Sequence, residues 1–170
     1  MSVKYQLTQN TIQYKNQTLY QIQALKDIPE IDLQAGSLGG YIANESNLSQ
    51  QGSCWVSYLN KQHYGIVCES AKVSENAHIG NGVKVSGTAE ISGNIDLFAS
   101  PFSDGVLISG NAKITGENVL IRARSRSSVA ISGNVEIDGD GVEICADNGY
   151  RLFIGGNVKI YEQAQLTGCC

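Results

Sequence analysis

Residues 77–91 read AHIGNGVKVSGTAEI and contain one short unit three times, as Ala77-His78-Ile79, Val83-Lys84-Val85 and Ala89-Glu90-Ile91. In an extended chain the first and third residues of such a unit lie on one side, and the middle residue lies on the other. Each unit therefore predicts a short strand with one aliphatic side. Successive units are six residues apart, so three of them fill 18 residues.

The unit occurs fourteen times in residues 71–166, and its first and third residues are always Ala, Val, Ile or Leu. A period of 23 residues then separates Val85, Ile108, Ile131 and Ile154. The simplest account is three strands per coil around a triangular core, with five residues added at one corner from the second coil onward. The sequence thus predicts an all-β, single-stranded parallel β-helix over residues 66–166, followed by a tail at 167–170.

The middle residues of every third unit should stack in columns on the outside of this helix. We name the three sides of the triangle face one, face two and face three. The face-one column reads Lys72, Glu90, Lys113, Glu136 and Lys159. The face-two column reads His78, Asp96, Leu120, Glu143 and Gln165. The face-three column reads Lys84, Leu107, Ala130 and Phe153. The alternating charges on face one support this register, and face three presents apolar side chains.

The hexads IGNGVK (residues 79–84) and VSGTAE (residues 85–90) resemble the hexapeptide repeat of left-handed parallel β-helices. The resemblance covers about residues 66–166 and implies that fold, but no single activity, because the fold hosts acyltransferases, carbonic anhydrases, caps and passive binders. A 23-residue coil also suits a right-handed β-helix. The 18-residue first coil and the small residues that follow the strands favour the left-handed form.

Residues 1–65 lack the unit and alternate loosely between apolar and polar residues around a turn at Lys15-Asn16-Gln17. This alternation predicts a β-hairpin. A solenoid needs a cover over its first coil, because an open coil exposes apolar core and unpaired strand edge. We therefore expect residues 1–65 to form an N-terminal β cap.

Four stretches of the first 56 residues resemble the leader of a mostly uncharacterised family of phage and prophage proteins. They are LYQIQAL (19–25), AGSLGGYI (35–42), NLSQQG (47–52) and CWV (54–56). In that family the leader precedes tandem β-helix hexads. The resemblance implies a mobile-element origin and supplies no active site, and the long corners of the later coils depart from the plain hexads of the family.

The composition excludes several classes of protein. A net charge of −4 and a pI of about 5.1 argue against direct nucleic-acid binding. No signal peptide and no apolar stretch of membrane-spanning length is recognisable. The five cysteines are Cys54, Cys68, Cys145, Cys169 and Cys170. Their number is odd and they form no C-x-x-C pair, which predicts neither a disulfide framework nor a zinc site. We expect a protein of the bacterial cytoplasm without cofactor or metal.

Two further motifs have a simple interpretation. Asp138-Gly139-Asp140-Gly141 is interpreted as a turn, with weak calcium binding as the alternative. Cys169-Cys170 is interpreted as a frayed tail, with acylation or an intermolecular disulfide as the alternative.

Three long corners, residues 98–105, 122–128 and 145–151, occupy the same place in successive coils and should stack into a ridge. Loops on a rigid scaffold are common functional sites. In extended form Arg122, Arg124 and Arg126 point the same way, where guanidinium groups can bind carboxylates or phosphates. The alternative is internal pairing of these arginines with Asp104 and Asp147.

The ridge borders the apolar column of face three, and an apolar patch rimmed by charge is typical of a protein-binding surface. The predicted partner-binding residues are Leu107, Ala130, Phe153, Arg122, Arg124, Arg126, Asp104, Tyr150 and Arg151. The alternative is that the long loops fold back and cover the column with Phe98, Phe102 or Tyr150.

His63 and His78 are the histidines of the chain. Hexapeptide-repeat acyltransferases use a histidine as general base, with acyl-coenzyme A in a groove between subunits, so either residue is the candidate base of an enzyme. The γ-type carbonic anhydrases use three zinc-binding histidines, which this chain does not have. We assign no catalytic residue and keep His78 and His63 as the alternative.

These observations favour a non-catalytic protein-binding module. The phage resemblance implies an inhibitor of a host defence complex, similar in role to an anti-CRISPR protein, that acts by occluding a surface of its target. An acyltransferase-like enzyme and a virion structural module are the alternatives. We also expect a homo-oligomer, with a dimer favoured, through the C-terminal coil end or face three, because an exposed coil end invites pairing.

Overall fold

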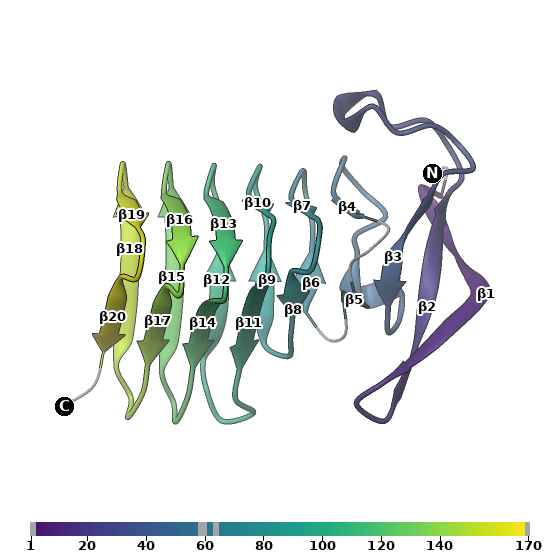
Figure 1. Ribbon diagram of the computed structural model, residues 1–170. Helices are drawn as coiled ribbons and strands as arrows, with labels where there is room; N and C mark the ends of the chain where they lie inside the picture. The colour runs from purple at the N-terminus through teal and green to yellow at the C-terminus, as the bar shows by residue number, and fades with distance from the viewer. Residues whose placement is uncertain (1–2, 58–60, 63–64, 169–170) are drawn as a thin grey trace.

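The structure is a computed structural model that describes residues 3–57, 61–62 and 65–168. A row of short, parallel, stacked strands extends from an N-terminal hairpin, as Figure 1 shows. The predicted all-β solenoid is confirmed, whereas its left-handed sense stays a prediction. No helix in the described part of the chain is long and apolar enough to cross a membrane.

Three parallel sheets form the sides of the solenoid. The sheet of face one contains β4 (Trp55–Val56), β7 (Lys72–Val73), β10 (Glu90–Ile91), β13 (Lys113–Glu117), β16 (Glu136–Asp140) and β19 (Lys159–Tyr161). The sheet of face two contains β8 (His78–Ile79), β11 (Ile95–Ala99), β14 (Val119–Ala123), β17 (Glu143–Ala146) and β20 (Gln165–Gly168). The sheet of face three contains β6 (Ile66–Val67), β9 (Val83–Val85), β12 (Gly105–Ile108), β15 (Ser128–Gly133) and β18 (Arg151–Gly156).

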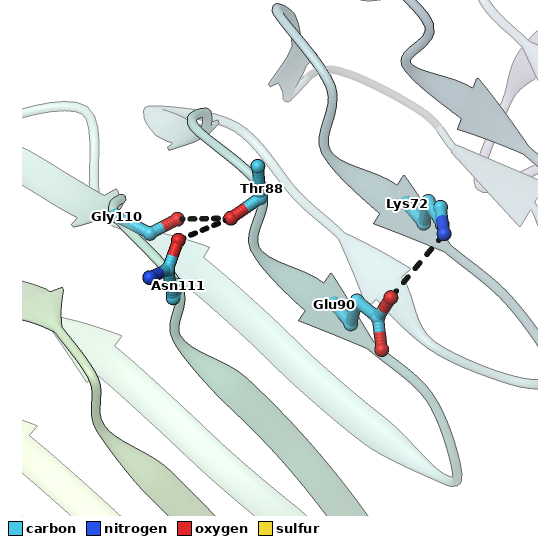
Figure 2. A network of polar contacts seen from close by, with 5 residues as sticks. All are labelled: Lys72, Thr88, Glu90, Gly110 and Asn111. Atoms are coloured by element: carbon cyan, nitrogen blue, oxygen red, sulfur yellow. Dashed lines mark hydrogen bonds and ion pairs between the residues drawn. The ribbon is translucent and has the colours of Figure 1, made fainter. Parts of the chain in front are cut away.

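The strand pairings confirm the predicted register on all three faces. Lys72, Glu90, Lys113, Glu136 and Lys159 are successive partners on face one. Two ion pairs form within this column, Lys72 Nζ to Glu90 Oε1 at 3.3 Å and Lys159 Nζ to Glu136 Oε2 at 2.9 Å. Figure 2 shows the first pair bridging two neighbouring coils. Hydrogen bonding to Lys159 lowers the pKa of Glu136, although exposed pairs of this kind contribute little to stability.

The aliphatic positions of the repeat form a continuous core. All of them are buried except Leu152, Val158, Ala164 and Leu166 in the last coil, which are partly buried. Three further buried residues, Ala99, Ala123 and Ala146, extend the inward pattern beyond the repeat unit. These alanines lie in β11, β14 and β17, so the strands reach further into the long corners than the sequence predicted.

A ladder of side-chain hydrogen bonds lines one short corner. The Thr88 hydroxyl contacts the Gly110 carbonyl oxygen at 3.3 Å and the side-chain oxygen of Asn111, as Figure 2 shows. The amide of Asn111 donates to Asn134, and Asn134 donates to Asn157, each over 2.9 Å. Stacked asparagines satisfy one another because each amide offers both a donor and an acceptor.

The predicted hairpin is confirmed. It consists of β1 (Tyr5–Tyr14) and β2 (Gln17–Ala24), which pair antiparallel. Its two turn residues, Lys15 and Asn16, have positive φ angles of 44° and 65°, as the turns favoured in two-residue hairpins require. The cap sheet continues with β3 (Leu38–Ile42) and β5 (Lys61–Gln62) in the order β1-β2-β3-β5. Two short 3-10 helices, η1 (Pro29–Ile31) and η2 (Glu45–Asn47), lie in the connections of the cap.

The solenoid begins before the predicted boundary at residue 66. Strand β4 pairs with β7 on face one, and β6 pairs with β9 on face three. Cys54 and Val56 are fully buried, so Cys54-Trp55-Val56 is a repeat unit in which a cysteine takes the first inward position. Trp55 points outward and is nevertheless buried, where it lines a cleft with Ile31 and Leu33 of the cap.

Candidate protein-binding surface

The three long corners stack as the sequence predicted. Within the ridge the Asp104 amide donates to the Ser127 carbonyl over 2.9 Å, and the Arg126 amide donates to the Phe102 carbonyl over 2.7 Å. The Gly149 amide donates to the Ser125 carbonyl over 2.9 Å. These loops therefore continue the backbone pairing of the strands that flank them, which gives the ridge a defined shape.

The three arginines of the middle loop do not lie on one extended strand. Ser125 and Arg126 have positive φ angles of 48° and 63°, so the chain turns where the prediction required an extended strand. Arg122 lies on the face-two side, where its Nη2 is 2.6 Å from Glu143 Oε1 and its Nε donates to Cys145 Sγ at 3.2 Å. The extended strand that the prediction required for Arg122, Arg124 and Arg126 therefore ends before Arg126.

The ion pairs of the ridge have other partners than the sequence predicted. Asp104 pairs with Arg151 over 3.5 Å, while Arg124 and Arg126 are exposed. Within the described ranges, neither of these two arginines has a carboxylate at ion-pair distance. A hydrogen bond from Ser125 lowers the pKa of Asp147, with smaller contributions from the Asn148 amide and from the nearby Arg124 and Arg122 charges.

The apolar column of face three is open to solvent. Leu107 is 42% exposed and Phe153 is 69% exposed, and Ala130 lies between them as their strand partner. The long loops do not cover this column, because Phe102 is itself 81% exposed and Phe98 lines a cleft on face two. The predicted alternative, in which the loops fold back over the column, does not hold.

A shallow groove of about 470 Å³ lies beside the column. Its lining includes Lys84, Asp104, Leu107, Ala130 and Arg151. It therefore places the Asp104–Arg151 pair next to the exposed apolar side chains. Tyr150 is 41% exposed at the ridge and precedes Arg151 directly. We call this combined surface, the face-three column with its groove and the exposed ridge arginines, the face-three surface.

The structure adds one residue to this surface that the sequence reasoning missed. Ile66 is the strand partner of Lys84, so it heads the face-three column, and it is 43% exposed. The sequence feature that could have identified Ile66 is Gly65-Ile66-Val67, a repeat unit in which glycine replaces the first aliphatic residue. Gly65 is needed there because a Cβ would collide with the Ile79 side chain.

A second cleft, of about 370 Å³, lies between the hairpin tip and face two. His78 and Asp96 line it, and His78 Nδ1 is 2.6 Å from Asp96 Oδ1. Lys15 reaches the cleft from the hairpin, and the Tyr14 ring lies 5.9 Å from the His78 ring. The repeat predicted that His78 and Asp96 are neighbours on face two. It did not predict that the hairpin packs against them, because no sequence pattern indicates where the cap lies on the solenoid.

Three sequence interpretations concern residues elsewhere. His63, Cys169 and Cys170 lie outside the described residues. Asp138 and Asp140 belong to strand β16, so their interpretation as a turn is wrong. Their carboxylates accept hydrogen bonds from Thr115 over 2.8 Å and from Asn118 over 3.1 Å.

Metal sites and known relatives give no further indication of function. In the part of the chain that the structure describes, no three His, Cys, Asp or Glu side chains are placed to hold a metal ion. Comparison with protein-family models finds no match, and comparison with curated proteins finds none either.

Proposed function

We propose that this protein is a non-catalytic binding module and that the face-three surface contacts a protein partner. The observation that carries the proposal is the exposed face-three column, in which Leu107, Ala130 and Phe153 are adjacent and Ile66 lies beyond Lys84. A contiguous apolar patch with a charged rim is typical of protein interfaces. Exposed aromatic and arginine side chains are also the residue types that dominate binding energy at such interfaces.

The charge of this surface indicates the partner. Lys84 and Arg151 line its groove, and Arg124 and Arg126 are exposed on the adjoining ridge, against the carboxylates of Asp104 and Asp147. This local excess of positive charge contrasts with the net charge of −4 for the whole chain. Complementary potentials speed association and set specificity, so the partner surface should be apolar at its centre and acidic at its edge.

The target we propose is a host defence complex in the bacterial cytoplasm. This step rests on the resemblance of the N-terminal segment to the leader of phage and prophage proteins. The mechanism is occlusion, as for anti-CRISPR inhibitors: the face-three surface covers a functional surface of the target. When the partner is absent, the same column favours a homodimer, which light scattering over a range of protein concentrations would detect.

The proposal predicts that the Phe153→Asp variant loses its partner while it keeps its fold. Tagged wild type and variant are used side by side to capture proteins from bacterial lysate, and the captured proteins are identified by mass spectrometry. One defence protein retained by the wild type and lost by the variant supports the proposal. The same set of proteins on both baits contradicts it, because a charge buried in the interface at the position of the most exposed aromatic residue of the column should abolish binding.

The second candidate function is an acyltransferase-like enzyme with His78 as general base. It is favoured by the short His78–Asp96 contact beside a cleft with an apolar floor, because a carboxylate on one ring nitrogen orients the other for proton transfer. Calorimetric titration with acyl-coenzyme A tests this candidate. Binding that is lost in His78→Ala would favour it, and the absence of binding would remove it.

A further inference from the structure

Lys4 is a buried lysine next to a buried cysteine. Both residues are 0% exposed, and Lys4 Nζ lies 3.1 Å from Cys54 Sγ. The same Nζ donates to the Cys54 carbonyl over 2.8 Å and to the Gly52 carbonyl over 3.4 Å. The Cys54 sulfur also lies near the Ser49 carbonyl at 3.5 Å. Hydrogen bonds to two backbone carbonyl groups therefore hold the amine against the thiol.

Burial of the Lys4 amine reduces the stability of the fold if the side chain serves only for packing. An ammonium group without a carboxylate partner loses its hydration when it is buried, and an apolar side chain of similar length would avoid that loss. Burial accordingly lowers the pKa of Lys4. A lowered pKa increases the fraction of neutral amine, which is the form that can bond covalently.

The pair also joins two parts of the fold. Lys4 directly precedes β1 of the cap, and Cys54 takes the first inward position of the first coil, 50 residues further along the chain. A covalent bond at this point would tie the cap to the solenoid. Such a long closed loop restricts the unfolded chain and so stabilises the folded one.

We infer that Lys4 and Cys54 form a covalent nitrogen–oxygen–sulfur bridge when the protein is exposed to dioxygen. The amine, the thiol and one dioxygen molecule give Lys4-NH–O–S-Cys54 and one water molecule. Nitrogen and sulfur lose two electrons each, and dioxygen gains four. One oxygen atom enters the bridge, and the other leaves as water with one hydrogen from nitrogen and one from sulfur.

The geometry favours an inserted oxygen over a direct bond. An oxygen between the two atoms spans most of the 3.1 Å that separates Nζ from Sγ. A direct sulfur–nitrogen bond would require a much closer approach and would pull Lys4 away from the carbonyl of Gly52. Because the site is closed to solvent, a small diatomic oxidant can reach it, whereas glutathione cannot.

Intact-mass spectrometry of the full chain tests the inference. The protein is purified under argon with reductant and then incubated in air-saturated buffer. The expected result is a gain of one oxygen atom less two hydrogen atoms, reversed by dithiothreitol. Tryptic digestion of the oxidised protein should yield residues 1–15 joined to residues 27–61, since a bridged Lys4 cannot be cleaved.

The controls separate the bridge from ordinary thiol oxidation. Cys54→Ser and Lys4→Met should each abolish the mass change, and Cys54→Ser serves alone if Lys4→Met does not fold. Cys145→Ser should retain it, because the Cys145 thiol contacts Arg122 and not an amine. A gain of oxygen without loss of hydrogen, a loss of two hydrogens without oxygen, or an unchanged mass would each overturn the inference.

Discussion

Ile131→Asp is expected to unfold the middle coils of the solenoid. Ile131 is 0% exposed and lies between Ile108 and Ile154 in the inward stack of face three. In the described structure the inward neighbours of Ile131 in its column are aliphatic, so the new carboxylate would be buried without a partner. An unpaired buried charge costs about 3–5 kcal/mol, which is a large part of the stability of a typical domain.

The adjacent residue provides a matched control for this prediction. Ala130→Asp places the same carboxylate one position earlier, where the side chain points outward and is only half-buried. Circular dichroism and thermal melting should show a folded Ala130→Asp protein and a largely unfolded Ile131→Asp protein. Equal melting temperatures for the two variants would contradict the assigned direction of the side chains.

Gly116→Ala is expected to cause the second-largest loss of stability. Gly116 has a φ of +124°, a conformation that side chains rarely adopt, and a Cβ there would overlap the carbonyl oxygen of Gly139 in the next coil. Because the obstacle is backbone, the coils must separate locally. Backbone strain and displacement together should cost about 3 kcal/mol or more in chemical denaturation.

Gly156→Ala separates the two causes of this effect. Gly156 has a positive φ of +85°, but nothing lies within 4 Å of the position that its Cβ would take. Its substitution should therefore cost only the conformational strain, about 1–2 kcal/mol. If both variants lose the same stability, the collision with the Gly139 backbone does not contribute to the effect of Gly116→Ala.

The repeat made most of the solenoid predictable. Period-two alternation assigns Val129 and Ile131 to the inside, and a slip by one residue would bury Ala130 and expose both. The charge order on face one provided an independent check, since Lys72, Glu90 and Lys113 alternate only in the register that the structure has.

Other features were not predictable because they depend on long-range contacts. The cap hairpin reaches over face two, where Tyr14 contacts His78, and nothing in either local sequence indicates this approach. Arg122 pairs with Glu143 across the neighbouring strands β14 and β17, and a turn at Ser125 and Arg126 ends the extended strand that the prediction assumed. Ile66 was missed because the repeat unit was defined by an aliphatic first residue, and here that residue is Gly65. A larger side chain at position 65 would collide with Ile79.

The central claim is that the face-three surface binds the partner, and affinity measurements on three variants test it most directly. The captured partner is titrated calorimetrically with wild type, Phe153→Asp, Arg124→Glu and Tyr161→Asp. Tyr161 is a matched control, since it is an exposed aromatic residue of the same last coil that lies in the sheet of face one. We expect Phe153→Asp and Arg124→Glu to weaken binding by about 30-fold or more, which corresponds to roughly 2 kcal/mol, and Tyr161→Asp to bind like the wild type. Unchanged affinity in both Phe153→Asp and Arg124→Glu would contradict the claim.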